Sequence, residues 1–174
     1  HKRNLVMAVD TILFGDCRTT LKSLEEKPRM CVTSPPYYGL RDYGGEESQI
    51  GQEQTPEEYI QNLVEVFRSV RDVLADDGTL WVNIGDSYYN YRPGKGQSYP
   101  KQSVSKTKQD LPQECNKRAN KLEGLKEKDL IGIPWMLAFA LRADGWYLRQ
   151  DIIWHKPNPM PESVRDRCTK SHEY

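Results

Sequence analysis

Two consecutive prolines follow a short apolar run early in the chain, and they limit what it can fold into. Residues 30–32 are apolar, as in a buried strand, and Pro35 and Pro36 follow directly after Ser34. Proline has no backbone N–H and fixes φ near about −65°, so a strand cannot continue through this pair. The chain therefore leaves a sheet here in a stiff turn, at the kind of edge where open α/β sheets bind ligands.

Apolar runs and helix signals alternate along the rest of the chain. Strands are expected at residues 11–14, 30–33, 79–84 and 146–154, with a further strand beginning at 172–174. Helices are expected at residues 19–24, 56–75 and 135–141. Thr55, Pro56 and Glu58 form the signature of a helix start with a capping box. The alternation predicts an α/β fold, with a mostly parallel sheet and helices on both faces.

Three tryptophans, Trp81, Trp135 and Trp154, are expected to lie in the core, with base stacking as the alternative for Trp154. The helix at 135–141 is expected to be buried nearly all round because it is apolar on almost every side.

Composition narrows the functional classes. The chain has 174 residues with a net charge of zero, so overall charge gives no sign of a nucleic-acid partner. No apolar run approaches the ~20 residues of a membrane span, and no membrane association is expected. The four cysteines and three histidines lack metal-ligand spacing, so no metal is expected.

Residues 89–128 form a polar segment in which basic side chains outnumber acidic ones. The low mean hydropathy of −0.80 is consistent with a long polar insertion of this kind. Two interpretations remain open: a spacer, or a basic arm that contacts phosphates once a nucleic acid is bound.

The turn after residue 33 has the groups needed to hold a flat ring that carries an amine. An exocyclic amine is a poor nucleophile, because its lone pair is delocalised into the ring. The Ser34 hydroxyl and the Pro35 carbonyl can accept hydrogen bonds from the two N–H groups of the amine. These hydrogen bonds favour a tetrahedral, reactive nitrogen. Tyr37 offers a face on which a flipped base can stack, a contact worth about 1–3 kcal/mol. No covalent adduct with the base is required, so no catalytic cysteine is expected.

The residues from Thr33 to Gly44, which read TSPPYYGLRDYG, resemble the catalytic motif of the S-adenosylmethionine-dependent amino-DNA methyltransferases. They are similar in particular to the permuted class, in which the catalytic half comes first. The resemblance implies catalytic roles for Ser34, Pro35, Pro36 and Tyr37. It implies cofactor contacts from Asp16, Ser34 and Pro35. It implies contacts to the substrate base or DNA from Tyr38, Asp86, His155, Lys156 and Pro157.

The same resemblance implies a partial Rossmann-like fold, S-adenosylmethionine as cofactor, double-stranded DNA as partner, and a cytoplasmic restriction–modification enzyme of bacterial, archaeal or phage origin. Ser34 stands where adenine-specific members more often carry an acid, which favours cytosine N4 as the methylated atom. The family's G-x-G cofactor loop and its target-recognition region have no counterpart here. Residues 1–174 are therefore expected to be one truncated catalytic domain that forms a homodimer or needs a complementary C-terminal half.

Several alternatives stay open. The same site can serve adenine N6, or an RNA or protein substrate. The chain can also be a non-catalytic nucleic-acid-binding remnant or one subunit of a split enzyme. Among single residues, Asp16 can simply cap a helix, Asp86 can be a turn residue, and His155 and Lys156 can be solvated.

Overall fold

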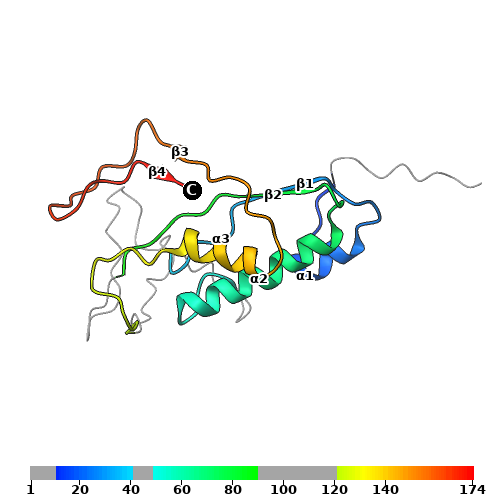
Figure 1. The fold of residues 1–174 in the computed structure, drawn as a ribbon, viewed down its shortest axis with the longest axis horizontal. Helices are drawn as coiled ribbons and strands as arrows, with labels where there is room; N and C mark the ends of the chain where they lie inside the picture. The colour runs from blue at the N-terminus through cyan, green and yellow to red at the C-terminus, as the bar shows by residue number, and fades with distance from the viewer. Residues whose placement is uncertain (1–10, 41–48, 90–120) are drawn as a thin grey trace, which may run out of the picture.

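The computed structural model describes residues 11–40, 49–89 and 121–174, and Figure 1 shows their arrangement. The elements in chain order are α1 (Cys17–Thr20), the 3-10 helix η1 (Leu21–Ser23), β1 (Met30–Thr33), α2 (Pro56–Val73), β2 (Thr79–Val82), α3 (Ile133–Ala143), β3 (Trp154–His155) and β4 (His172–Glu173). Most of the basic segment expected at 89–128 lies outside the described residues. No helix among the described residues is long and apolar enough to cross a membrane.

The strands form a parallel pair and an antiparallel pair that meet near the end of the chain. β1 runs parallel to β2, with Met30 opposite Thr79. β3 runs antiparallel to β4. The segment after β2 joins the two pairs, because Ile84 N donates to Tyr174 O at 2.9 Å and Tyr174 N donates back to Ile84 O at 3.4 Å. β4 is thereby brought beside the carboxyl ends of β1 and β2.

Helix α2 forms as its sequence predicts. The Thr55 side chain accepts a hydrogen bond from Glu58 N at 3.2 Å, and the Glu58 carboxylate accepts one from Thr55 N at 3.3 Å, which completes the capping box. The apolar face of α2 makes the core with α3; its buried members are Tyr59, Ile60, Leu63, Val64, Phe67, Val70, Ile133, Leu137 and Leu141.

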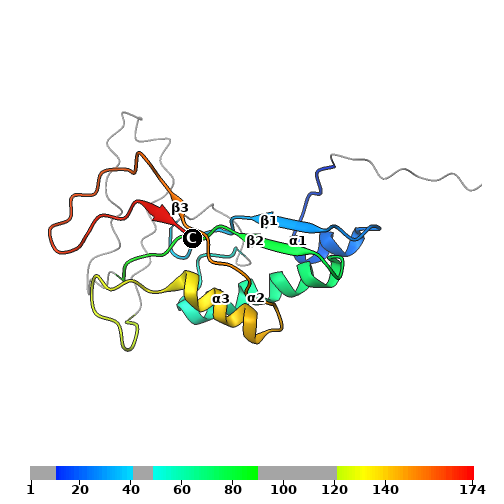
Figure 2. The same cartoon turned by 45° about the horizontal axis from the view of Figure 1, so that its top comes forward.

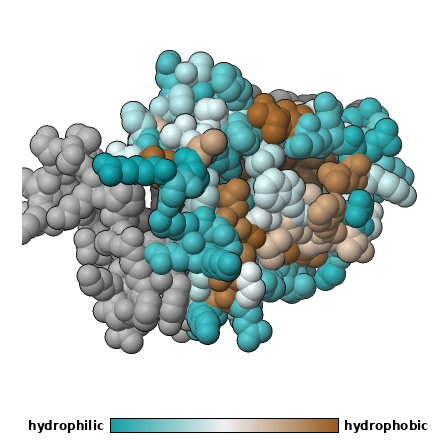
Figure 3. Space-filling view, turned by 60° about the vertical axis from the view of Figure 1, so that its left-hand side comes forward, coloured by the Kyte–Doolittle hydropathy of each residue, from teal (hydrophilic) through white to brown (hydrophobic). Residues whose placement is uncertain are grey.

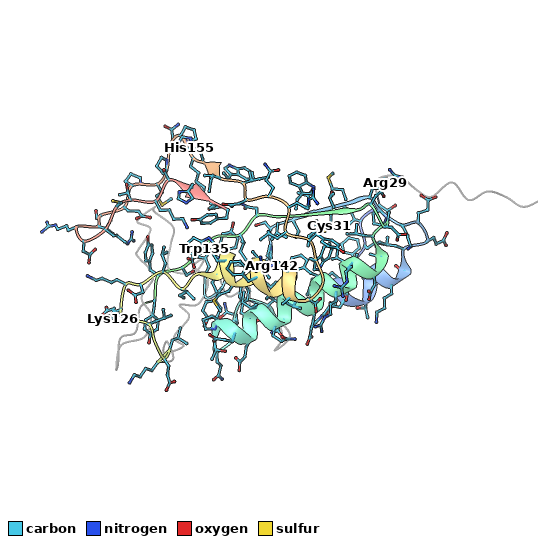
Figure 4. The ribbon with its side chains drawn as sticks, in the orientation of Figure 1. Arg29, Cys31, Lys126, Trp135, Arg142 and His155 are labelled. Carbon is cyan, nitrogen blue, oxygen red and sulfur yellow. The ribbon has the colours of Figure 1, made fainter. Side chains whose placement is uncertain are left out.

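All three α-helices lie on the same side of the β1–β2 pair, as the two views in Figures 1 and 2 agree. Cys31 and Leu80 pack against the helices from this side of the sheet, and Figure 4 shows Cys31 between β1 and the helical layer. On the opposite face Val32 and Trp81 are 68% and 45% exposed. The mixed α/β class and the parallel pairing are confirmed, whereas helices on both faces are not found among the described residues.

The predictions of two strands, at residues 11–14 and 146–154, are wrong. Residues 11–14 form no strand, and Phe14 is 88% exposed. Of the strand expected at 146–154, only the last residue lies in β3, and Ile152 and Ile153 are about half exposed. An apolar run becomes a strand only where a neighbouring ladder takes up its backbone hydrogen bonds, and no described residues do so here.

The tryptophans and α3 are also more exposed than expected. Trp135 and Trp154 are 43% and 62% exposed, and Phe139 on α3 is 54% exposed, so α3 buries one face only. Figure 3 shows hydrophobic residues at the surface, interleaved with hydrophilic ones. Apolar composition on every side of α3 was therefore a poor guide to its burial, because among the described residues the core shared with α2 covers one of its faces.

Candidate active site

The turn after β1 is anchored at its second proline and exposed at its start. Tyr59, fully buried on α2, donates its hydroxyl to the Pro36 carbonyl at 2.7 Å. Burial raises the pKa of Tyr59, so the hydroxyl remains a donor. Ser34 is exposed, and no donor from the described residues reaches the Pro35 carbonyl. The Ser34 side chain is therefore accessible, and the Pro35 carbonyl has no partner among the described residues, on a turn that Tyr59 holds in place.

Tyr37 is fixed at both ends of its side chain. Its hydroxyl lies 3.0 Å from Asn83 Oδ1 and 3.0 Å from Glu173 Oε2. Its ring lies so close to Gly85 that a Cβ added there would be 2.7 Å from Tyr37 Cε2. Partial burial raises the pKa of Tyr37; the Ser34 hydroxyl acts in the opposite sense, and Glu173 adds to the rise. The phenol thus stays protonated and held next to Ser34.

Lys156 reaches the same cluster through Glu173. The Lys156 ammonium is hydrogen-bonded to Glu173 Oε1, while the other carboxylate oxygen faces Tyr37. Partial burial alone would raise the pKa of Glu173, but hydrogen bonds from Lys156 and Tyr37 outweigh it and hold that pKa below its ordinary value. The structure therefore brings together the turn after β1 and the loop after β3, through a carboxylate that the sequence did not single out.

Tyr38 turns away from these groups. Its hydroxyl donates to the Gln54 carbonyl at 3.3 Å, and its ring lies 5.5 Å from that of Tyr59. Burial, with the nearby glutamates, raises the pKa of Tyr38 to about 12. The structure does not place Tyr38 beside Ser34, and its predicted contact with the substrate stays a prediction.

Asp86 caps helix α3. Its carboxylate accepts hydrogen bonds from Gly132 N and Ile133 N, all at 3.0 Å, and from Ser87 N at 2.9 Å. These donors include N–H groups that the helix itself leaves without partners at its N-terminus. This geometry favours the structural interpretation of Asp86.

Asp86→Ala is accordingly expected to lower the free energy of unfolding by about 1–2 kcal/mol, the usual cost of losing an N-terminal cap, and Asp86→Asn to lower it much less. Urea denaturation followed by circular dichroism measures both. A fully stable Asp86→Ala would contradict the capping role. A stable Asp86→Asn that has lost activity would instead restore the substrate role.

Asp16 also caps a helix. Its carboxylate accepts Arg18 N at 2.8 Å at the start of α1 and is ion-paired with the Arg18 guanidinium, which lowers the pKa of the carboxyl. The side chain remains partly exposed. The described contacts of Asp16 are local, and its role toward a cofactor stays a prediction.

His155 and Pro157 flank Lys156 at the surface. His155 lies in β3 opposite His172 of β4, and Figure 4 shows it on the side of the sheet away from α2 and α3. Both His155 and Pro157 are exposed. Their predicted contacts with DNA also stay predictions.

Two residues of the cluster escaped sequence reasoning, Asn83 and Glu173. Asn83 offered a usable signal, because it is the polar residue that ends an apolar strand and so lies at the ligand-binding edge of a parallel sheet. Glu173 offered none, since it meets Tyr37 across 136 positions of sequence.

A parallel pair of strands leads into a Ser-Pro-Pro-Tyr turn that Tyr59 anchors from helix α2. The chain belongs to the DNA methylase family, whose model matches residues 29–174. Members of this family use S-adenosylmethionine as methyl donor.

Relatives in several bacteria agree with this assignment. The chain is 53% identical over 164 residues to the Type II methyltransferase M.SmaI of Serratia marcescens, a match that covers 94% of this chain and 53% of the relative. It is 50% identical over 171 residues to M.XycI of Xanthomonas campestris pv. cyanopsidis, covering 98% and 54%, and 51% identical over 165 residues to M.Cfr9I of Citrobacter freundii, covering 94% and 52%. The chain thus spans about half the length of these relatives. No solved structure matches it.

Proposed function

We propose that this chain is the catalytic part of a DNA methyltransferase that methylates the exocyclic amine of a flipped base, with cytosine N4 as the acceptor. The observation that carries the proposal is the anchored turn. The Tyr59 hydroxyl donates to the Pro36 carbonyl, whereas Ser34 is exposed and no described donor reaches the Pro35 carbonyl, so these two groups are the acceptors left for an amine. The match to Type II methyltransferases supports DNA as the substrate class.

The turn would act by shaping the nucleophile. When both N–H groups of the amine donate hydrogen bonds to these two acceptors, the nitrogen moves out of conjugation with the ring. The nitrogen lone pair then becomes available for attack. Tyr37 would hold the base by stacking, and its ring is already immobilised by Gly85 and by the two partners of its hydroxyl. After alkylation the nitrogen carries a surplus proton, which the exposed Ser34 hydroxyl can pass toward water.

S-Adenosylmethionine, when bound, supplies a methyl group on a positively charged sulfur. The described residues fit such a donor in part. The Pro35 carbonyl and the Ser34 hydroxyl are acceptors suited to a cation; Ser34 is exposed, and the Pro35 carbonyl has no donor among the described residues. The Asp16 carboxylate is engaged by Arg18 and would have to exchange part of that contact to receive an amine or hydroxyl. Ser34, Pro35 and Asp16 are therefore the residues proposed to hold the donor.

Product analysis tests the proposal. The complete gene product is incubated with S-adenosylmethionine carrying a labelled methyl group and with unmethylated duplex DNA, which is then digested to nucleosides. N4-methylcytosine is the expected product. N6-methyladenine would move the assignment to the alternative base at the same site. DNA binding without any methylated nucleoside would favour a non-catalytic remnant or a subunit that needs a partner chain.

A further inference from the structure

The end of the described chain reaches the proposed active site through β4. Glu173 lies opposite Trp154 in the β3–β4 pair, and its neighbour Tyr174 pairs with Ile84 just beyond β2. This pairing carries the Glu173 side chain to the carboxyl ends of β1 and β2, where the turn containing Tyr37 begins. A carboxylate is thus held by backbone pairing on both sides, next to the aromatic ring proposed to receive the base.

The Tyr37 hydroxyl faces two acceptors but has only one proton to give. Asn83 Nδ2 donates to the Tyr174 carbonyl at 3.1 Å, which orients the amide so that Asn83 Oδ1 faces Tyr37. The other acceptor is the Glu173 carboxylate, and an ionised acceptor makes the stronger hydrogen bond. The Tyr37 hydroxyl therefore donates its hydrogen bond to Glu173, and this carboxylate sets the direction of the phenol O–H.

Lys156 completes the arrangement by balancing the carboxylate's charge. Its ammonium is bonded to Glu173 Oε1, and the carboxylate side chain is 24% exposed. The groups acting on this carboxylate are Lys156 from the loop after β3, Tyr37 from the turn after β1, and Asn83 after β2. Lys156 is thus ion-paired with Glu173, although its own side chain is 43% exposed.

We propose that Glu173 is a positioning residue: its carboxylate, kept ionised by Lys156, holds the Tyr37 ring in the orientation on which the flipped base stacks. The role rests on the proposed function for its effect on methyl transfer. The contact between Glu173 and Tyr37, however, can be measured without any turnover. In this role Lys156 acts on the base through Glu173 and Tyr37, and its predicted direct contact with DNA stays a prediction.

Two readouts on the complete gene product test this role. In the first, 3-fluorotyrosine is incorporated, and the ¹⁹F resonance of Tyr37 is assigned by its loss in Tyr37→Phe. This resonance is expected to shift as acid protonates Glu173. In Lys156→Met, the lysine no longer lowers the pKa of Glu173 against the effect of burial, which raises it. The midpoint of the shift therefore moves to higher pH. The shift disappears in Glu173→Gln.

In the second readout, the rate of methyl transfer is measured in a single turnover. Glu173→Ala is expected to lower it roughly tenfold to hundredfold, the size expected for loss of a charge-assisted hydrogen bond. Glu173→Gln, which keeps an acceptor for the phenol, should retain more of the rate. Asp166→Asn is the matched control, because Asp166 pairs with Lys128 on the surface and touches neither Tyr37 nor Glu173; it should leave rate and resonance unchanged.

The outcomes separate this inference from the proposed function. A Tyr37 resonance that does not respond to Glu173→Gln, or a midpoint unmoved by Lys156→Met, would overturn the positioning role whether or not DNA is methylated. If the wild-type protein methylates no DNA while both fluorine results hold, the contact stands and the methyltransferase proposal fails. A full rate in Glu173→Ala would show that the orientation of Tyr37 by this carboxylate does not matter for transfer.

Discussion

Ser34→Ala is expected to lower the rate of methyl transfer by about 10²–10³-fold, the loss typical when one preorganised hydrogen-bonding group is removed from an active site. The hydroxyl is exposed at the start of a turn whose position depends on Tyr59 and Pro36, so its removal should leave the fold unchanged. The rate is measured in a single turnover with labelled S-adenosylmethionine and duplex DNA. Binding of S-adenosylmethionine, followed by calorimetry, should change little, since Pro35 and Asp16 remain.

Ser69→Ala is the matched control for this prediction. Ser69 lies on α2, with its hydroxyl directed to the Glu65 carbonyl in the preceding turn, far in sequence from the proposed site. It should methylate DNA at the wild-type rate. Undiminished transfer by Ser34→Ala would remove Ser34 from the mechanism and leave the Pro35 carbonyl as the acceptor to test next.

The parts of the fold that the sequence predicted are those with strong local signals. The capping box at Thr55 and Glu58 satisfies backbone donors within a single turn, so its effect does not depend on distant residues. The double proline ends β1 at Thr33 for an equally local reason, because neither proline can donate to a ladder. Both features appear in the structure where the sequence placed them.

The parts that the sequence did not predict depend on partners distant in the chain. Residues 11–14 and 146–153 have the composition of strands, but a strand exists only where another backbone pairs with it. Glu173 meets Tyr37 only because the Ile84 and Tyr174 pair draws β4 against the end of β2. Local pattern cannot reveal a contact of this kind.

Polar residues that follow apolar runs have structural or chemical roles, and only the geometry shows which role each one has. Asp86 and Asp16 both follow apolar runs, and the carboxylate of each caps the N-terminus of a helix. Ser34 also follows an apolar run but caps no helix, and the Pro35 carbonyl accepts no hydrogen bond from the described residues. The candidate chemistry therefore concentrates on the turn itself, which makes the packing beneath that turn important.

Gly85→Ala is expected to disturb that packing and to cost both stability and activity. The new Cβ would lie 2.7 Å from Cε2 and 3.0 Å from Cδ2 of Tyr37, closer than such atoms can approach. The ring cannot retreat without stretching its hydrogen bonds to Asn83 and Glu173. Overpacking of this kind costs typically about 1–3 kcal/mol in the free energy of unfolding, and a ring displaced by about 1 Å can lower transfer about 10²-fold.

A double-mutant cycle shows whether Tyr37 is the cause. Gly85→Ala is compared in the wild-type protein and in Tyr37→Ala, with the free energy of unfolding measured by urea denaturation. If the clash with the ring accounts for the cost, the substitution should be nearly neutral in the Tyr37→Ala background, giving a coupling of about 1 kcal/mol or more. Equal costs in the two backgrounds would show that Gly85 is required for its own backbone rather than for Tyr37. In that case the ring would owe its place to the hydroxyl contacts alone, and Glu173→Ala would be the more damaging of the two changes.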